Sequence, residues 1–172
     1  MSLRSALARL LGREELPEGF AGPLDAEERV LALAPLVGGG HVVVTSLGVW
    51  LPEGRRVSWH LVSKATWANG AMGLTEADEV ETLEGVVLLA DRAPRQLRLA
   101  EPGRVPQAVH ERVTGSVRSR HHRDLPGGGA WFVQRKVPGR DGTVLQVRPD
   151  PGTDPGAVRH VAAEVGRTLR SS

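Results

Sequence analysis

The feature that most constrains this fold is a series of short, β-branched segments with Gly or Pro residues between them. After Val30–Val37 the chain breaks at Gly38–Gly40, and His41–Ser46, Gly48–Leu51 and Arg56–Val62 follow in close succession. Val and Thr side chains suit a pleated, half-buried surface, and Gly and Pro mark turns. This spacing is typical of antiparallel strands joined by hairpins. The sequence therefore predicts a β-meander.

The same pattern continues to residue 100. Asn69–Gly70 is a strong hairpin signal, because both residues tolerate the positive φ of a type I′ turn. Further strands are predicted at Lys64–Ala68, Ala71–Thr75, Val80–Thr82, Val86–Ala90 and Gln96–Ala100. The last two are expected to pair with each other around Asp91–Pro94. Strands at such spacing favour a barrel or a strongly bent sheet.

Three amphipathic helices are predicted outside this meander. The first covers residues 3–11, where leucines recur at helical spacing. The second has Pro106 in its first turn and a stripe of valines on one face: Val105, Val109, Val113 and Val117. The third has Asp154 as its N-cap and extends through Leu169. Its apolar face comprises Val158, Val161, Ala162, Val165 and Leu169.

Further strands, from Ser119 to Arg148, are predicted between the second and third helices. We therefore interpret the chain as one α+β domain in three parts. Residues 1–22 form an N-terminal helix and loop, and residues 23–118 form the β-meander and its helix. Residues 119–172 form a basic β-hairpin and a C-terminal helix packed on the same domain. Whether this last part extends the main sheet or forms a separate layer stays open.

Composition excludes several classes of site. The chain has no Cys, so disulfides, thiolate catalysis and zinc–thiolate sites are excluded. The first residues carry scattered arginines and no continuous apolar run, unlike a secretory signal. No stretch approaches the ~18 apolar residues of a membrane span. We therefore expect a cytoplasmic protein without an integral membrane segment.

Charge is distributed unevenly along the chain. The formal net charge is only +2, so the pI of about 9.9 is weak support for nucleic-acid binding. Eight Lys or Arg residues lie between Glu111 and Arg148, against three acidic residues. The stretch from Asp78 to Asp91 is acidic by comparison. This asymmetry predicts a molecule with a basic and an acidic side.

The basic cluster is the main candidate binding site. Trp131 and Phe132 lie within it, and adjacent strand residues point to opposite faces, so one of the two is expected in the core. Basic side chains beside aromatic ones can bind nucleic acid, an acidic protein surface or anionic lipid headgroups. A plain solvated surface is the alternative. The predicted basic face comprises Arg118, Arg120, Arg123, Arg135, Lys136 and Arg140.

His121, His122 and Asp124 are the most site-like polar cluster outside this face. On a strand the two histidines point to opposite faces and do not share a metal ion, so no metal or other cofactor is expected. Ser116 and Ser119 lack the strained elbow of a nucleophilic serine. The glycine runs precede strands, whereas phosphate-binding loops precede helices. No catalytic residue is assigned.

A meander of about seven strands closed by a helix resembles the pleckstrin-homology-like (PH-like) barrel. The resemblance is carried by Gly39–Trp67, where a strand runs into Thr45-Ser46, turns, and gives further apolar strands. This is similar to the pattern of bacterial PH-like domains, and it extends loosely over residues 24–118. It implies an antiparallel PH-like β-barrel or bent sheet that binds peptides or lipids or self-assembles. The basic residues usual after this turn are replaced by Leu47-Gly48, which argues against phosphoinositide recognition at these positions.

Together these features favour a non-enzymatic intracellular binding or scaffold module. Its expected partner is another protein or a second copy of itself. The first alternative is binding of nucleic acid or an anionic membrane through the basic face. The second is an enzyme that uses the region of His121, His122 and Asp124.

Overall fold

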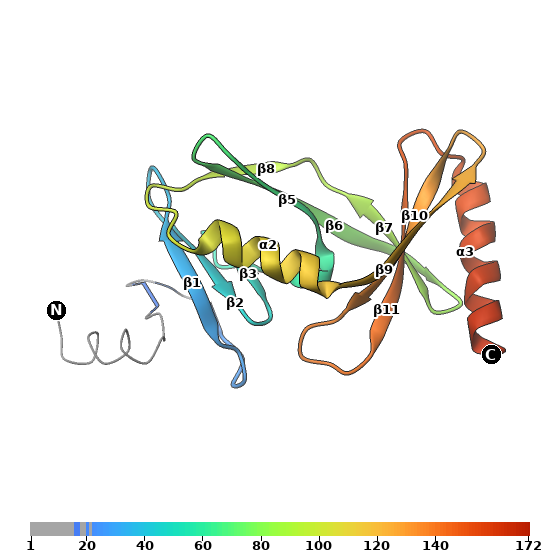
Figure 1. Ribbon diagram of the computed structural model, residues 1–172, viewed down its shortest axis with the longest axis horizontal. Coiled ribbons are helices and arrows are strands. Elements are labelled where there is room, and N and C mark those ends of the chain that lie inside the picture. Colours follow the sequence, from blue (N-terminus) through green and yellow to red (C-terminus); the bar gives the residue numbers. More distant parts are fainter. Residues whose placement is uncertain (1–15, 18–19, 21) are drawn as a thin grey trace.

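A strongly curled, mostly antiparallel sheet forms the body of this α+β protein (Figure 1). The structure is a computed structural model that describes residues 16–17, 20 and 22–172. The helix predicted at residues 3–11 lies outside the described residues. No helix in the described part of the chain is long and apolar enough to cross a bilayer.

The first half of the meander folds as predicted. The four strands pair antiparallel in chain order, and Gly38, Gly39 and Gly40 all have positive φ in the first turn. Glycine is suited to this turn because it has no Cβ to clash in the left-handed region. The strands are β1 (Val30–Pro35), β2 (His41–Thr45), β3 (Gly48–Trp50) and β4 (Arg56–Ser58).

The predicted strand Arg56–Val62 is interrupted by a 3-10 helix, η1 (Trp59–Leu61). Trp59 turns into the core there, where its Nε1–H donates to the carbonyl of Thr45 over 3.0 Å. The chain then enters β5 (Val62–Ala68), which belongs to a second sheet. Burial of the indole therefore overrides local strand preference at this bend.

The second sheet is built around one long strand, β6 (Ala71–Leu83), which replaces the two strands predicted there. Its first half pairs with β5 and β8 (Arg95–Arg98), and its second half pairs with β7 (Val86–Asp91). The predicted hairpin between residues 86–90 and 96–100 is therefore wrong. Because β6 is much longer than either partner, it accommodates β7 and β8 at separate positions along its length.

The two sheets meet to form a curled, half-barrel unit. Leu36 and Leu99 form an isolated antiparallel bridge, and the Val37 N–H donates to the Arg98 carbonyl over 2.9 Å. Helix α2 (Val105–Ser116) packs against β1, β2, β5 and η1, as its valine stripe predicts. The core includes Val42, Val44, Trp59, Met72, Val105 and Val109.

Three more strands extend the second sheet beyond this barrel. They are β9 (Val117–Leu125), β10 (Gly128–Lys136) and β11 (Thr143–Pro149), in the order β7-β11-β10-β9. The C-terminal part therefore extends the main sheet. β11 pairs with β7 in parallel, so the prediction of an entirely antiparallel sheet is wrong at this pair. A parallel neighbour needs a long connection, and here β8 and α2 of the barrel, followed by β9 and β10 of the extension, supply it.

Helix α3 (Pro155–Arg170) covers one face of this extension at the far end of the molecule (Figure 1). The predicted N-cap is confirmed, because an Asp154 Oδ2 accepts a hydrogen bond from the Ala157 N–H over 2.9 Å. Val158, Val161 and Ala162 are buried against the sheet, whereas Leu169 is 54% exposed. The last turn of α3 therefore carries its apolar stripe into solvent.

The three tryptophans of the meander do not all lie in the core. The sequence favours core and cross-strand packing for Trp50, Trp59 and Trp67. Trp50 and Trp59 are buried, but Trp67 is 42% exposed on β5. The last three residues of β5, Thr66, Trp67 and Ala68, are all exposed, although Trp67 shares its strand face with the half-buried Ala65. Core packing is therefore wrong for Trp67, which lies opposite Met72 across the β5–β6 pair.

Arg135 joins the barrel to the sheet extension. It lies on β10 and is only 2% exposed. Its guanidinium donates to the carbonyls of Trp59 and Val62, each over 2.7 Å, and to the Ser116 Oγ over 2.6 Å. One side chain thus links β10 to η1, to the start of β5 and to the end of α2. No carboxylate pairs with Arg135 among the described residues, so burial lowers its pKa to about 10, with further repulsion from Arg148.

We expect Arg135→Met to lower the free energy of unfolding by about 3–5 kcal/mol. The methionine fills much of the same volume but removes the guanidinium donors to the Val62 carbonyl and the Ser116 Oγ in a buried site, and it leaves the Trp59 carbonyl with only the Val62 N–H. Urea unfolding monitored by tryptophan fluorescence measures this loss. Arg123→Met is the matched control on the exposed edge, with an expected change within about 0.5 kcal/mol. Equal stability of Arg135→Met and the wild type would contradict this role.

Candidate functional site

The six residues of the predicted basic face lie in five different environments. Arg120 is opposite Val133, and Arg123 is opposite Ala130, so alternation places Arg120 and Arg123 on opposite faces of the sheet. Arg118 and Lys136 line a pocket at the end of α2, and Arg140 is exposed in the β10–β11 loop. Arg135 is buried at the junction. The predicted single face is therefore wrong, and Arg135 cannot meet a partner on the surface.

The aromatic residues within this cluster behave as strand alternation predicts. Phe132 is buried beneath α3, and Trp131 lies on the other face. The Arg120 guanidinium lies 4.6 Å from the centre of the Trp131 ring, and the His122 ring meets the same indole edge-on at 4.9 Å. Trp131 is therefore already covered by two neighbours, which leaves little of its ring free for stacking on a ligand.

His121 and His122 lie on opposite faces, as predicted. His121 lines a groove with Phe132 and Val165, whereas His122 contacts Trp131 and lies 2.7 Å from an Asp150 Oδ2. Asp124 is exposed, with an oxygen 3.6 Å from the His122 Nδ1. Among the described residues, no group of three His, Asp or Glu side chains is placed to hold a metal ion.

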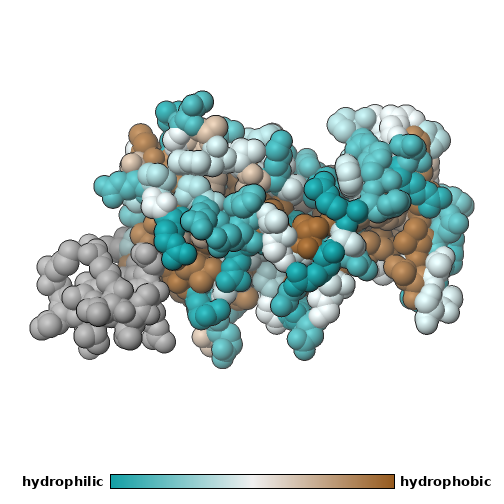
Figure 2. Space-filling view, viewed as in Figure 1, coloured by the Kyte–Doolittle hydropathy of each residue, from teal (hydrophilic) through white to brown (hydrophobic). Residues whose placement is uncertain are grey.

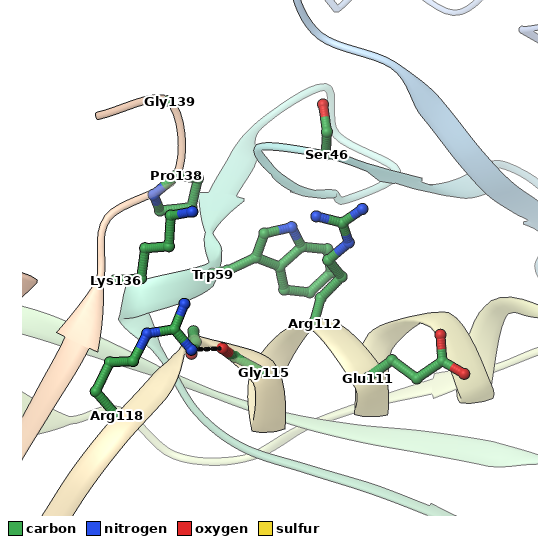
Figure 3. Close-up of a pocket in the computed structure, with 10 residues that line it drawn as sticks. Ser46, Trp59, Glu111, Arg112, Gly115, Arg118, Lys136, Pro138 and Gly139 are labelled. Atoms are coloured by element: carbon green, nitrogen blue, oxygen red, sulfur yellow. Dashed lines mark hydrogen bonds between the residues drawn. The ribbon is translucent and has the colours of Figure 1, made fainter. Parts of the chain in front are cut away.

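A pocket of about 340 Å³ at the C-terminal end of α2 brings together three cations, Arg112, Arg118 and Lys136. Figure 3 shows Arg112, Arg118 and Lys136 arranged around the indole of Trp59, with Ser46 on the opposite rim. We call this cavity the basic pocket. Its walls come from η1, α2, β9 and β10 and from the β2–β3 and β10–β11 turns. The residues that line it are Ser46, Trp59, Glu111, Arg112, Gly115, Ser116, Arg118, Lys136, Pro138 and Gly139.

Local structure explains why cations gather here. The carbonyls at the end of a helix carry partial negative charge, and the Arg118 Nη1 donates to the Gly115 carbonyl over 2.9 Å. The strand register shifts between Gln134 and Arg135, so Arg118 is the extra residue of a bulge and is directed toward the helix end. Lys136 follows at the end of β10.

Unlike several arginines of the barrel, the cations of the basic pocket form no ion pairs with carboxylates among the described residues. Arg55 binds Glu76 over 2.6 Å, Arg92 binds Asp78 over 2.7 Å, and Arg95 binds Glu53 over 2.6 Å. Within the described part of the chain, Arg112, Arg118 and Lys136 have no carboxylate within 4.0 Å. Their charges are therefore available to an external anion.

Sequence reasoning missed part of this pocket. Arg112, Trp59 and Ser46 were not in the predicted basic face, although they line the same cavity as Arg118 and Lys136. A signal for Arg112 was present, because it lies one turn before the end of α2 and off the valine stripe. Trp59 and Ser46 carried no such signal, since their approach to α2 depends on the η1 bend and barrel closure.

His60, between the basic pocket and the junction, has an unusual environment. Its pKa is lowered to about 4, because burial and then the positive charges of Arg135 and Arg140 disfavour the imidazolium. Its Nδ1 is buried without a hydrogen-bond partner. Its carbonyl accepts from the Gln146 side chain over 2.7 Å. The fold therefore favours neutral His60.

This environment predicts an acid-sensitive fold. The unfolded chain protonates His60 near pH 6.5 and the folded protein only near pH 4, so stability is lost as pH falls between these values. Allowing for partial solvent contact, we expect His60 to contribute about 1–2 kcal/mol of this loss. Urea unfolding at pH 6.5 and pH 4.5 measures it. His60→Leu keeps the His60 carbonyl contacts and should lose correspondingly less stability; an unchanged pH dependence would refute the prediction.

Comparisons with known proteins give no family for this chain. No protein-family model matches it, and neither a curated protein nor a solved structure matches it. What the protein binds must therefore be inferred from its own surface chemistry.

Proposed function

We propose that this chain is a non-enzymatic intracellular binding module of PH-like type that recognises an acidic surface on a protein partner. The basic pocket is the proposed contact. The observation that carries the proposal is the set of three cations, Arg112, Arg118 and Lys136, without acidic partners around one cavity. Charges arranged in this way steer an oppositely charged partner and fix its orientation.

The strand order supports the PH-like part of the proposal. Through the Leu36–Leu99 bridge, the barrel runs β4-β3-β2-β1-β8-β6-β5, and α2 packs across it. A meander followed by a helix is what the resemblance of Gly39–Trp67 to bacterial PH-like domains implies, so this strand order supports the proposal. Such barrels serve many recognition functions, so the partner has to be inferred from the pocket and not from the fold.

A protein partner fits the surface better than nucleic acid or a membrane does. Phe132 is buried and Trp131 is covered by Arg120 and His122, so neither aromatic residue offers a free stacking surface for bases. Arg120 and Arg123 lie on opposite faces of the sheet, whereas a planar bilayer requires its cations on one side.

Self-association through opposite charges is less well supported than binding of a different protein. Of the four acidic side chains of β6, three are engaged within the chain, and only Glu79 has no ion pair among the described residues. Glu76 contacts Arg55, Asp78 contacts Arg92, and Glu81 contacts Arg159. We therefore expect a monomer by light scattering, with a mass near 18.4 kDa.

The proposal is tested by affinity capture with a charge-reversal variant, Arg112→Glu/Arg118→Glu/Lys136→Glu. Proteins captured by the wild type from its native cell are identified, and the affinity of each purified partner is then measured. We expect the variant to bind at least about tenfold more weakly, which corresponds to about 1.4 kcal/mol. Nuclease treatment should not affect capture.

The matched control reverses three exposed cations elsewhere, as Lys64→Glu/Arg98→Glu/Arg104→Glu. It makes the same change in net charge and should retain partner binding. Equal weakening by both triple variants would show only a nonspecific charge effect and would refute the basic pocket as the contact. Loss of capture after nuclease treatment would favour the nucleic-acid alternative.

A further inference from the structure

A second pocket, of about 350 Å³, lies on the other side of the last turn of α2 from the basic pocket. Figure 2 shows a hydrophobic hollow beside this end of α2, bordered by strongly hydrophilic residues. We call it the arginine pocket. It is lined by Ser63, Val113, Thr114, Val117, Arg120, Val133, Arg135 and Arg148.

Three guanidinium-bearing residues, Arg120, Arg135 and Arg148, line this pocket from neighbouring strands. Arg120 is on β9, Arg135 on β10 and Arg148 on β11, all on the face of the sheet opposite α3. Arg135 is buried, and its positive charge is met by carbonyls and a hydroxyl instead of a carboxylate. A buried cation without an anion is costly, so the pocket favours an incoming negative charge.

Arg148 contributes a hydrogen-bond donor without a partner to this pocket. Its Nε is buried and has no hydrogen-bond partner. An Asp91 Oδ1 lies 3.3 Å away, close enough for charge attraction but outside hydrogen-bonding geometry. Asp91 also accepts from the Ser63 hydroxyl and is not among the residues that line the pocket, so this single carboxylate is shared, and the pocket lining itself carries three positive charges and no carboxylate.

The remaining walls indicate the kind of anion. Val113, Val117 and Val133 form an apolar side, and Ser63 and Thr114 supply hydroxyl groups. Guanidinium groups match the oxygen atoms of phosphate, and an apolar wall accommodates a short carbon skeleton. We propose that the arginine pocket binds the phosphate group of a small organic phosphate. This site is separate from the basic pocket and does not depend on the proposed protein partner.

The test is thermal unfolding with inorganic phosphate or glycerol 3-phosphate, each against sodium chloride at equal ionic strength. We expect about 10 mM of either phosphate to raise the Tm of the wild type by about 2–6 °C above the chloride value, with the larger shift for glycerol 3-phosphate. The Arg135 Nε–H resonance should move in the same titration. Absence of a phosphate-specific shift with both compounds would overturn the proposal.

Two variants locate the site. Arg120→Gln removes an exposed guanidinium that takes no part in the Arg135 junction, and Arg148→Gln removes the buried donor. Each should reduce the phosphate shift to the chloride value, and an undiminished shift in both would overturn the assignment. Arg112→Gln/Lys136→Gln should keep the phosphate shift while weakening partner binding. Loss of the shift in that variant would instead place phosphate in the basic pocket.

Discussion

The fold depends on one buried cation that joins two parts of the sheet. Arg135 reaches from β10 to the carbonyls of η1 and β5 and to the hydroxyl at the end of α2. These carbonyl and hydroxyl oxygens lie in a closed junction, where polar atoms need hydrogen-bond partners. The guanidinium donates hydrogen bonds to several of them at once. The cost is an unpaired positive charge in the interior. Its position fixes how the strands β9, β10 and β11 meet the barrel.

Both candidate sites follow from this arrangement. The end of α2 lies over the junction, and a pocket opens on each side of its last turn. The basic pocket combines residues of the barrel, such as Trp59, with Arg118 and Lys136 of the extension. The arginine pocket has Arg135 itself in its wall. Neither could form on an isolated barrel or an isolated hairpin. The extension therefore supplies Arg118 and Lys136 to the proposed basic pocket and Arg120, Arg135 and Arg148 to the proposed arginine pocket.

Local patterns predicted elements well and long-range partners poorly. The Asn69–Gly70 turn, the Asp154 cap and the opposite orientation of His121 and His122 depend on neighbouring residues, and the structure has all three. The pairing of β7 and β8 with separate halves of β6 depends instead on distant residues. By local pattern alone, β7 and β8 could equally have paired with each other as a hairpin. Arg135 was misplaced for the same reason. From its position in the strand, Arg135 looks like an ordinary exposed basic residue. Its guanidinium can be buried only because carbonyls from distant parts of the chain accept its hydrogen bonds.

The central claim is that Arg135 holds the sheet extension, and hence the walls of both pockets, against the barrel. Hydrogen exchange measured by mass spectrometry on the wild type and Arg135→Lys tests it most directly, because a lysine keeps the charge but cannot reach the same set of acceptors. We expect faster exchange in Val117–Leu125 and Gly128–Lys136 and unchanged protection in the barrel strand His41–Thr45. Equal acceleration in all three strands, or none in any, would contradict it.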